Sequence, residues 1–389
     1  MNLSVSQPET YEKLKQLLKV NHDTFDISYK PYYFSNHLVH ALCSMYYSGA
    51  SPGQLEEYYN YYTNRLEKLP EPKFEINREN WLSYLSEKDN YAEYLQFFQK
   101  EVNENGMVPA LNHFLPKLIA GFAGAALHPL IHLGYAVEFD LPQVAAEGLA
   151  YACTFYLSVG EFIDNLPQSS ESKSISELRN QISNLDVSNL YGPMLRIFKF
   201  EQTQSQYGSL LTELVSKWKL TNDPKCIEEK SNELTRESIK LFGNSTYRGK
   251  FDFFFLHQVT GNNSIRALMT VLPPDQQIRL LRINLATYLI LFLTLGAPST
   301  DESRITDYNS NTFNEVKNLK QLLKMTTYHK DDHLIKVIRN IYQFDGEFGT
   351  EKEHSYFFKL AVKVWDAVQT EADWYYDGIG YYQSSNASL

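Results

Sequence analysis

Apolar side chains recur along most of this chain at intervals of three and four residues, the spacing that places them on one face of an α-helix. Residues 8–20 repeat leucine in this way, at Leu14, Leu17 and Leu18. Proline and glycine interrupt such segments, as at residues 49–53. The pattern predicts further helices at residues 37–48, 54–68, 91–103, 142–158, 206–220, 226–242, 264–271, 274–295, 314–325, 331–342 and 355–370.

The most apolar part of the chain is residues 108–139, which predict two helices separated by a bend at Leu127–Pro129. Gly121 and Gly124 precede the bend. We expect these glycines to permit close packing of helices, because no strand–glycine–helix pattern for binding phosphate surrounds them. Around the bend the groups that titrate are two histidines and Tyr135.

Three segments depart from the helical pattern. Residues 250–259 are the strongest candidate for a strand, although they could equally enter a helix. Residues 167–186 are polar and predict a surface excursion, and residues 381–389 predict a frayed tail. Four side chains of the first segment could line a flat apolar pocket but more often belong to a core: Phe251, Phe253, Phe254 and Phe255.

The pattern as a whole predicts an all-α fold, built as a single multi-helix, bundle-like domain over residues 1–389. No repeat of 20–50 residues occurs. No strand–GxGxxG–helix unit and no GxSxG elbow occur either, so the sequence predicts no flavin or other nucleotide cofactor.

Composition narrows the possible partners. A net charge of −10 and a pI near 5.5 argue against nucleic acid, and no cluster of lysine and arginine that could neutralise phosphates occurs. The 28 Tyr and 23 Phe favour large cores or an apolar cleft. Three widely spaced cysteines are typical of reduced thiols in a cytoplasmic protein: Cys43, Cys153 and Cys226.

The sequence also predicts neither secretion nor a membrane partner. The first nine residues are polar and lack the pattern of a secretory signal. Residues 118–137 and 283–295 are apolar enough to raise the question of a membrane. The first of these contains two histidines, a proline and three glycines, and the second is short, so we interpret both as buried core helices.

Seven of the ten histidines occur at four places, three of which are pairs at helical spacing. They are His37 with His40, His128 with His132, His257, and His329 with His333. Most lie on apolar segments, whereas His22 and His354 have the charged neighbours expected of surface histidines. Histidines directed inward from several apolar helices predict a transition-metal site inside a helical bundle. The alternative is a set of core histidines bonded to carbonyls, which is the more frequent case for an isolated HxxxH pair.

A carboxylate ligand for such a site is hard to place in the sequence. The apolar block has none before Glu138 and Asp140, and no HExxH motif occurs. Asp331 and Asp332 stand where a helix begins, and we interpret them as residues that cap the helix and stabilise its dipole.

Lys336 shares a helix face with His333 and lies among apolar residues. A buried lysine loses its proton more readily, and a neutral amine can add carbon dioxide to give a carbamate, an anionic ligand. The alternative, which the chemistry alone favours, is that Lys336 reaches solvent or pairs with an acidic residue.

Several of these segments together resemble the questin oxidase family. The most specific is HPLIHLGYAVEF at His128–Phe139, which is close to a HPLIHLGYGLEF-type segment of that family. Weaker matches lie around it, at Asn36–Leu42 with Gly49–Ser51, His257–Thr260, His333–Arg339 and Trp365–Ala367. The resemblance covers about residues 30–370, and residues 166–228 match nothing in it.

The resemblance implies an oxidoreductase that inserts oxygen to cleave a ring of a polycyclic aromatic or quinone substrate of the polyketide type. Such an enzyme is a dioxygenase or a Baeyer–Villiger-type monooxygenase. The resemblance implies a mononuclear non-haem metal, Fe(II) or alternatively Zn, with O2 and a small aromatic molecule as partners. It leaves open NADPH as an external reductant, the substrate and the oligomeric state.

The resemblance also transfers residue roles by position. The metal ligands that it implies are His37, His128, His132, His257, His333 and Lys336. The catalytic residues that it implies are His132, Tyr135 and Lys336, with Lys336 open to carbamylation.

Two other functions stay open at this point. A helical binding or scaffold protein could keep the fold without the chemistry, with its histidines satisfied structurally. A zinc-dependent hydrolase would need a carboxylate base beside the metal, and Glu138 lies almost three helical turns beyond His128.

Overall fold

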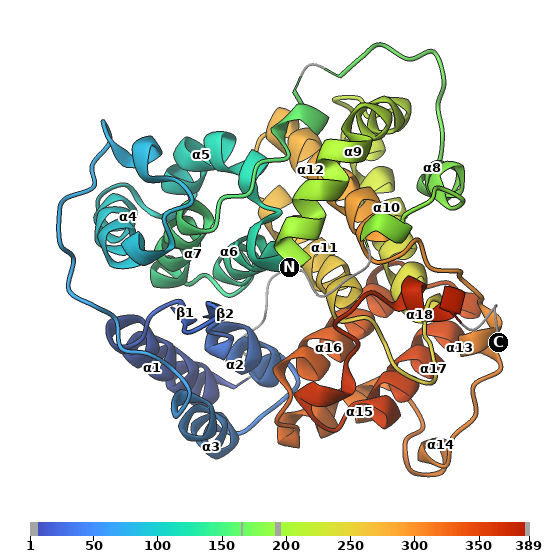
Figure 1. The fold of residues 1–389 in the computed structure, drawn as a ribbon. Coiled ribbons are helices and arrows are strands. Elements are labelled where there is room, and N and C mark those ends of the chain that lie inside the picture. The colour runs from blue at the N-terminus through green and yellow to red at the C-terminus, as the bar shows by residue number, and fades with distance from the viewer. Residues whose placement is uncertain (1–6, 165, 191–195, 386–389) are drawn as a thin grey trace. The chain divides into compact units, whose positions relative to one another are not determined.

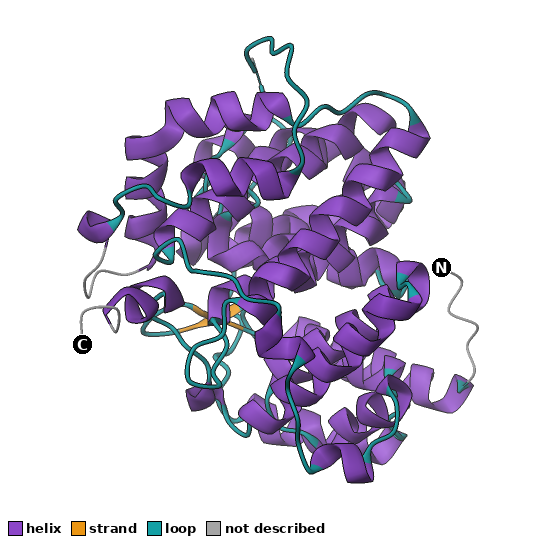
Figure 2. Ribbon diagram, turned by 90° about the vertical axis from the view of Figure 1, so that its right-hand side faces the viewer, coloured by secondary structure: helices purple, strands orange, loops and turns teal. Residues whose placement is uncertain are grey.

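Helices make up nearly all of the regular structure (Figure 2). The computed structural model describes residues 7–164, 166–190 and 196–385. Within these residues the one sheet is a hairpin of two short strands, β1 (Ser28–Tyr29) and β2 (Phe34–Ser35). The prediction of an all-α fold is therefore confirmed.

The chain forms two compact units, each assembled from three segments of sequence. The first consists of Met1–Ser158, Asn263–Pro273 and Leu323–Arg339. The second consists of Val159–Asn262, Pro274–Leu322 and Asn340–Leu389. The single domain over residues 1–389 stays a prediction.

The helices of the first unit come mainly from the N-terminal part of the chain (Figure 1). They are α1 (Pro8–Thr24), α2 (Leu38–Tyr47), α3 (Pro52–Thr63), α4 (Tyr91–Asn105), α5 (Met107–Leu118), α6 (His128–Glu138) and α7 (Pro142–Thr154). Helix α7 packs along both α4 and α6, and α1 packs against α2 and α3. The predicted apolar stripes are the buried faces, since Leu14 and Leu18 of α1 and Leu55 of α3 are fully buried.

The second unit is built around one long apolar helix, α12. Its elements are α8 (Ile175–Ile182), α9 (Arg196–Lys217), α10 (Pro224–Asn244), α12 (Pro274–Thr294), α13 (Ser303–Thr306), α14 (Thr312–Glu315), α17 (Glu351–Ala367) and α18 (Ile379–Ser385). Three more helices contribute residues to both units: α11 (Phe253–Met269), α15 (Leu319–Met325) and α16 (Asp332–Phe348). Helix α12 packs against α8, α9 and α10.

Helix α12 is the described helix that could cross a membrane by length and composition alone. Its most apolar window is 72% buried inside the protein, as is usual for a core helix. The interpretation of this segment as a buried core helix therefore fits the structure better than a membrane span.

The three segments that depart from the helical pattern all contain helix. The strand candidate at residues 250–259 enters α11, because the Asp252 side chain accepts hydrogen bonds from the N–H groups of Phe254 and Phe255 and caps the helix. The polar excursion at residues 167–186 contains α8, which begins with a capping box of Ser174 and Glu177. Residues 381–385 belong to α18, and the rest of the predicted tail lies outside the described residues.

The predicted bend before α6 is confirmed, and it begins earlier than the proline. Ala125, Ala126 and Leu127 all have left-handed backbone conformations, with φ of 45°, 52° and 67°. Such conformations cost about 1–3 kcal/mol each for residues other than glycine, so the surrounding packing must hold them in place. Gly124 makes the turn possible, because a Cβ atom there would overlap the carbonyl oxygen of Phe155.

We predict that Gly124→Ala lowers the free energy of unfolding by about 3 kcal/mol or more, because the added methyl group meets rigid backbone. Urea unfolding followed by circular dichroism measures this change. Gly53→Ala is the matched control, since Gly53 lies exposed in the first turn of α3 and nothing nearer than 4.0 Å faces its Cβ position. Equal stability of the two variants would contradict the close approach of Gly124 to the backbone of Phe155.

Candidate metal centre

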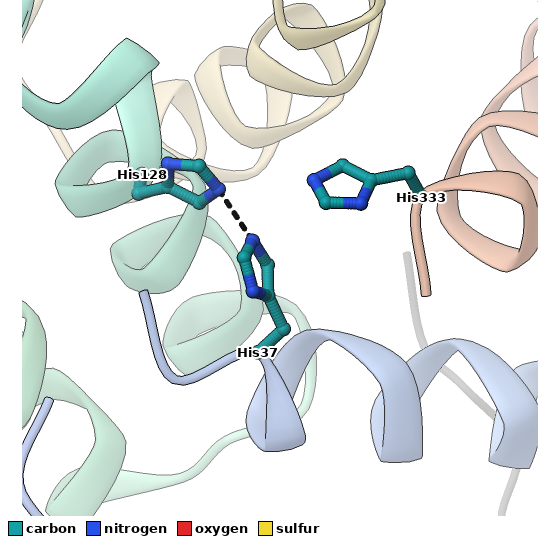
Figure 3. Close-up of side chains that lie close together, drawn as sticks. All are labelled: His37, His128 and His333. Atoms are coloured by element: carbon teal, nitrogen blue, oxygen red, sulfur yellow. Dashed lines mark hydrogen bonds between the residues drawn. The ribbon is translucent and has the colours of Figure 1, made fainter. Parts of the chain in front are cut away.

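Three buried histidines of the first unit meet at one point, and each stands at the beginning of a helix (Figure 3). His37 directly precedes α2, His128 is the first residue of α6, and His333 is the second residue of α16. One ring nitrogen of each lies within 4.8 Å of a ring nitrogen of the other two. The sequence therefore predicted correctly that these three segments bring histidines together.

His37 is fixed by its neighbours on both sides of the ring. The Asn36 side chain accepts a hydrogen bond from the N–H of Leu38 at 3.1 Å and donates one to Asn21 at 2.9 Å, which anchors the start of α2. The hydroxyl of Tyr62 lies 3.1 Å from the backbone nitrogen of His37 and 3.2 Å from its Nδ1. These contacts leave Nε2 of His37 pointing at the other histidines.

His128 is fixed by the left-handed turn. Its Nδ1–H donates to the carbonyl of Ala125, which assigns the proton to Nδ1 and leaves a lone pair on Nε2. Nε2 of His37 lies 2.7 Å from Nε2 of His128, so His37 donates to that lone pair. The Tyr62 hydroxyl, which can donate and accept, then donates to Nδ1 of His37.

A carboxylate joins the histidines from the start of α16. Asp331 caps the helix as predicted, since its side chain accepts from the N–H of Leu334 at 2.7 Å. Asp332 instead faces the cluster. Its Oδ2 lies 3.2 Å from Nδ1 of His333, 3.8 Å from Nε2 of His37 and 2.9 Å from Nζ of Lys336. Asp332 is thus the acidic residue that the sequence analysis could not place.

Burial and a nearby cation keep His37 and His128 neutral. Burial lowers the pKa of His37 well below its ordinary value, and the ammonium of Lys336 and the neighbouring histidines lower it further. Burial, followed by Lys336, lowers the pKa of His128 to about 3. Neutral imidazole is the form that binds a metal ion, so the rings of His37 and His128 are in the ligand form at neutral pH.

Lys336 itself is completely buried and pairs with Asp332. This contact agrees with the alternative in which the lysine finds an acidic partner. The role of Lys336 as a metal ligand or carbamate stays a prediction.

His40, His132 and Tyr135 form a second layer behind the three histidines. The His40 ring lies parallel to the Tyr135 ring with centroids 5.2 Å apart, and its centroid lies 5.2 Å from that of His132. Burial raises the pKa of Tyr135 to about 12, so its hydroxyl stays protonated and bonds to Ser44 at 2.7 Å. A catalytic role for Tyr135 or His132 stays a prediction.

A buried carboxylate holds His132 from behind. Glu147 of α7 lies 2.8 Å from Nε2 of His132 and 2.7 Å from Nδ1 of His22. His22 is only 4% exposed, so its interpretation as a surface histidine is wrong. Burial raises the pKa of Glu147, but the hydrogen bonds with both histidines outweigh it and bring the pKa to about 2. One signal in the sequence was missed: Glu147 is the only charged residue of the mainly apolar helix α7.

A second buried ion pair closes this side of the first unit. Arg339 is fully buried and donates to Glu138. Its guanidinium lies 4.6 Å from the ring centroid of Tyr47, 5.1 Å from that of Tyr135 and 5.3 Å from that of Phe139. Glu138 is therefore engaged by arginine, which agrees with its exclusion as a metal-bound base.

His257 belongs to the second unit, and its role as a ligand stays a prediction. It lies on α11, where its Nδ1 bonds to the carbonyl of Phe253 at 2.8 Å. Phe251 and Phe255 of the same segment are completely buried and belong to the core.

The fold and site together define a class: an all-α protein with a cluster of buried histidines and one carboxylate between its helices. The family profile described as questin oxidase-like matches residues 34–341, and the chain belongs to this family. Its relatives are similar over most of their length. Membership of this family, together with relatives that are named as oxidases and monooxygenases, places the chain among the oxidoreductases.

Three relatives show how low the sequence identity is within this family. A Baeyer–Villiger monooxygenase of Cryptosporiopsis sp. is 23% identical over 391 residues, covering 92% of this chain and 86% of the relative. A Baeyer–Villiger oxidase of Pestalotiopsis microspora is 26% identical over 368 residues, covering 85% and 80%. A questin oxidase of Aspergillus terreus is 22% identical over 354 residues, covering 84% and 79%.

We predict that Glu147→Gln lowers the free energy of unfolding by about 3–5 kcal/mol, because it breaks a buried ion pair. The pKa of Glu147 is depressed, so its contribution is complete above pH 4.5 and is lost as the pH falls toward 2. The pKa of His22 is raised, because its bond with Glu147 outweighs burial, which lowers it. The contribution of His22 is therefore complete below pH 6.5 and is lost as the pH rises through the raised pKa.

Urea unfolding at pH 3, 5.5 and 8.5 measures this dependence. We expect the difference between wild type and Glu147→Gln to be largest at pH 5.5 and smaller at both ends. Glu104→Gln, which removes an exposed carboxylate from α4, controls for the loss of charge. A difference that does not change with pH would show that the variant acts through packing alone.

Proposed function

We propose that this protein is a metal-dependent oxygenase that opens a ring of a flat polycyclic phenol or quinone. The observation that carries the proposal is the meeting of His37, His128 and His333 with Asp332 in a chain of the questin oxidase-like family. Three imidazoles and one carboxylate are a donor set suited to Fe(II) or Zn and unsuited to Mg or Ca. The names of the relatives favour oxygen chemistry, and hence iron.

The proposed ligands are Nε2 of His37, Nε2 of His128, a ring nitrogen of His333 and the carboxylate of Asp332. Their fit to a metal ion rests on features of the protein itself. The rings of His37 and His128 are neutral, and the lone pair of His128 is fixed by the Ala125 carbonyl. The Asp332 carboxylate, 3.2 Å from Nδ1 of His333, would balance part of the positive charge. When bound, the metal ion supplies oxygen activation and polarises a phenolate or carbonyl oxygen of the substrate.

The residues around the ligands then have distinct tasks. His37 must carry its proton on Nδ1 rather than Nε2 before Nε2 can bind a metal ion. The Tyr62 hydroxyl can then accept a hydrogen bond from Nδ1–H, because its own proton can be donated to the carbonyl oxygen of Ser35 at 3.4 Å. Lys336 holds Asp332 beside the imidazoles. Glu147 orients His132, and Tyr135 supports the His40 ring.

The substrate and cosubstrate follow from the family only as proposals. We propose a small aromatic polyketide-type molecule and O2 as the reacting partners, NADPH as an external reductant where a monooxygenase stoichiometry requires one, and the cytoplasm as the location. The absence of a flavin motif from the sequence is consistent with metal-based chemistry.

We predict that the purified protein, reconstituted with Fe(II) under anaerobic conditions, retains about one iron per chain. His128→Ala and Asp332→Asn should lower iron retention at least about tenfold, because each removes a ligand from the set. Elemental analysis after desalting measures this. His113→Ala is the matched control, because His113 is an exposed histidine of α5 in the same unit.

Three other results would overturn the assignment. Retention of iron by His128→Ala would place the metal elsewhere. Exclusive retention of zinc would favour a hydrolytic centre, for which Asp332 provides the carboxylate that the sequence analysis lacked. Failure of the wild type to retain any transition metal would support a fold that has kept its histidines for structure.

We predict that the iron-loaded protein consumes O2 when hydroxyanthraquinones are added, and that His128→Ala reduces the rate by more than about 100-fold. An oxygen electrode, with and without NADPH, measures both the reaction and its need for a reductant. His113→Ala should retain the wild-type rate. Oxygen uptake that is equal in wild type and His128→Ala would show that the histidine cluster is not the reacting centre.

A further inference from the structure

A cavity of about 520 Å³ lies within the second unit, among residues that the metal centre does not use. Its wall comes from the segment after the short turn Gly160–Phe162, from the C-terminal end of α9 with the residues that follow it, and from α12. Five of the ten residues of the wall are apolar. The polar ones include two cations, Lys219 and Arg282, and no acidic residue among those whose side chains the structure describes.

Arg282 has no acidic partner within the described residues, and its Nε is buried without a hydrogen bond. Other arginines of the same unit differ from it. Arg279, one turn earlier on α12, pairs with Asp164 at 3.4 Å. Arg179 pairs with Glu237 at 3.3 Å, and Arg236 pairs with Glu353 at 2.9 Å. The unpaired cation is therefore a property of the cavity.

An unpaired guanidinium in this position is unfavourable for folding. Burial lowers the pKa of Arg282, and no carboxylate opposes the effect. Removing its Nε–H from water without a replacement partner has a free-energy cost. Residues that violate the ordinary rules of burial in this way are frequently retained for binding.

Lys219 adds a second positive charge in a fixed place. Its Nζ donates to the carbonyl of Ser169, which ties the segment after Gly160–Phe162 to the end of α9. The hydroxyl groups of Ser169 and Ser216 and the amide of Gln168 supply further polar groups on the wall. This set can receive the oxygen atoms of an anion, with the charge of Arg282 as its strongest element.

The remainder of the wall favours an organic ligand over a simple inorganic anion. Trp218 lies behind the wall, only 1% exposed, and its indole N–H donates to Glu233 at 3.0 Å. Leu166, Pro167 and Leu220 supply apolar surface. A volume of about 520 Å³ is in the range of cavities that hold small organic molecules.

We infer that this cavity binds a small organic carboxylate, with Arg282 receiving the carboxylate group and Leu166, Pro167 and Leu220 contacting the hydrophobic part. The inference does not depend on the metal centre. Most of the wall comes from residues 166–228, which match none of the family motifs in the sequence.

The test is calorimetric titration of the full chain with 2-naphthoate, with its neutral isostere 2-naphthamide and with inorganic phosphate. We expect naphthoate to bind at a single site at least about tenfold more tightly than naphthamide or phosphate. Arg282→Gln should abolish the preference for the carboxylate. Arg248→Gln, which removes an exposed positive charge from the same unit, should leave the preference unchanged.

The inference is overturned if Arg282→Gln binds naphthoate as the wild type does, or if naphthoate has no advantage over naphthamide. Phosphate binding as tight as that of naphthoate would also overturn it, because the site would then recognise any anion.

The thermal midpoint of the unliganded protein provides an independent measurement. If Arg282 is kept for a ligand, Arg282→Gln leaves the midpoint unchanged or raises it, because an unpaired buried cation is removed. A lower midpoint would assign Arg282 a structural role and overturn the inference.

Discussion

The first unit is organised by the close approach of two imidazole nitrogens in a buried core. Nε2 of His37 lies 2.7 Å from Nε2 of His128, which is possible only when the two rings share one proton between these atoms. Protonation of both would place two positive charges side by side, with Lys336 adding a third. The Ala125 carbonyl and the Tyr62 hydroxyl determine which nitrogen carries a proton. Stability of the core and readiness for a divalent cation therefore have the same cause.

Helical periodicity predicted most of the fold, because the spacing of leucines and tyrosines within each segment determines which face of the helix is buried. It failed where a contact distant in sequence decides the structure. The Asp252 side chain caps α11 and also accepts a hydrogen bond from the N–H of Ile379 at 3.1 Å, at the start of α18. No local pattern reveals that second bond. The capping box of Ser174 and Glu177, in contrast, was a local signal hidden in a polar segment.

The histidines of the site could be predicted from spacing and family resemblance, but their partners could not. Asp332 was interpreted as a cap because the first residues of a helix favour acids for local reasons, and only the folded chain shows that it faces His37 and His333. His22 was misjudged because Lys19 and Asp23, its charged sequence neighbours, form an exposed ion pair while the ring itself points inward to Glu147. The residues next to a side chain in sequence indicate the composition of its helix. Only the packing of the folded chain shows whether that side chain points to the core or to solvent.

The assembly of the first unit from three distant segments has a consequence for the order of events during synthesis. Roughly 300 residues separate His37 from His333, a long separation that makes their contact slow to form. At ordinary rates of translation, about 15–60 s pass between the emergence of the two. Throughout that interval the α2 and α6 histidines exist without the segment that carries Asp332. A nascent chain therefore cannot bring Asp332 and His333 to His37 and His128 until most of the protein has left the ribosome.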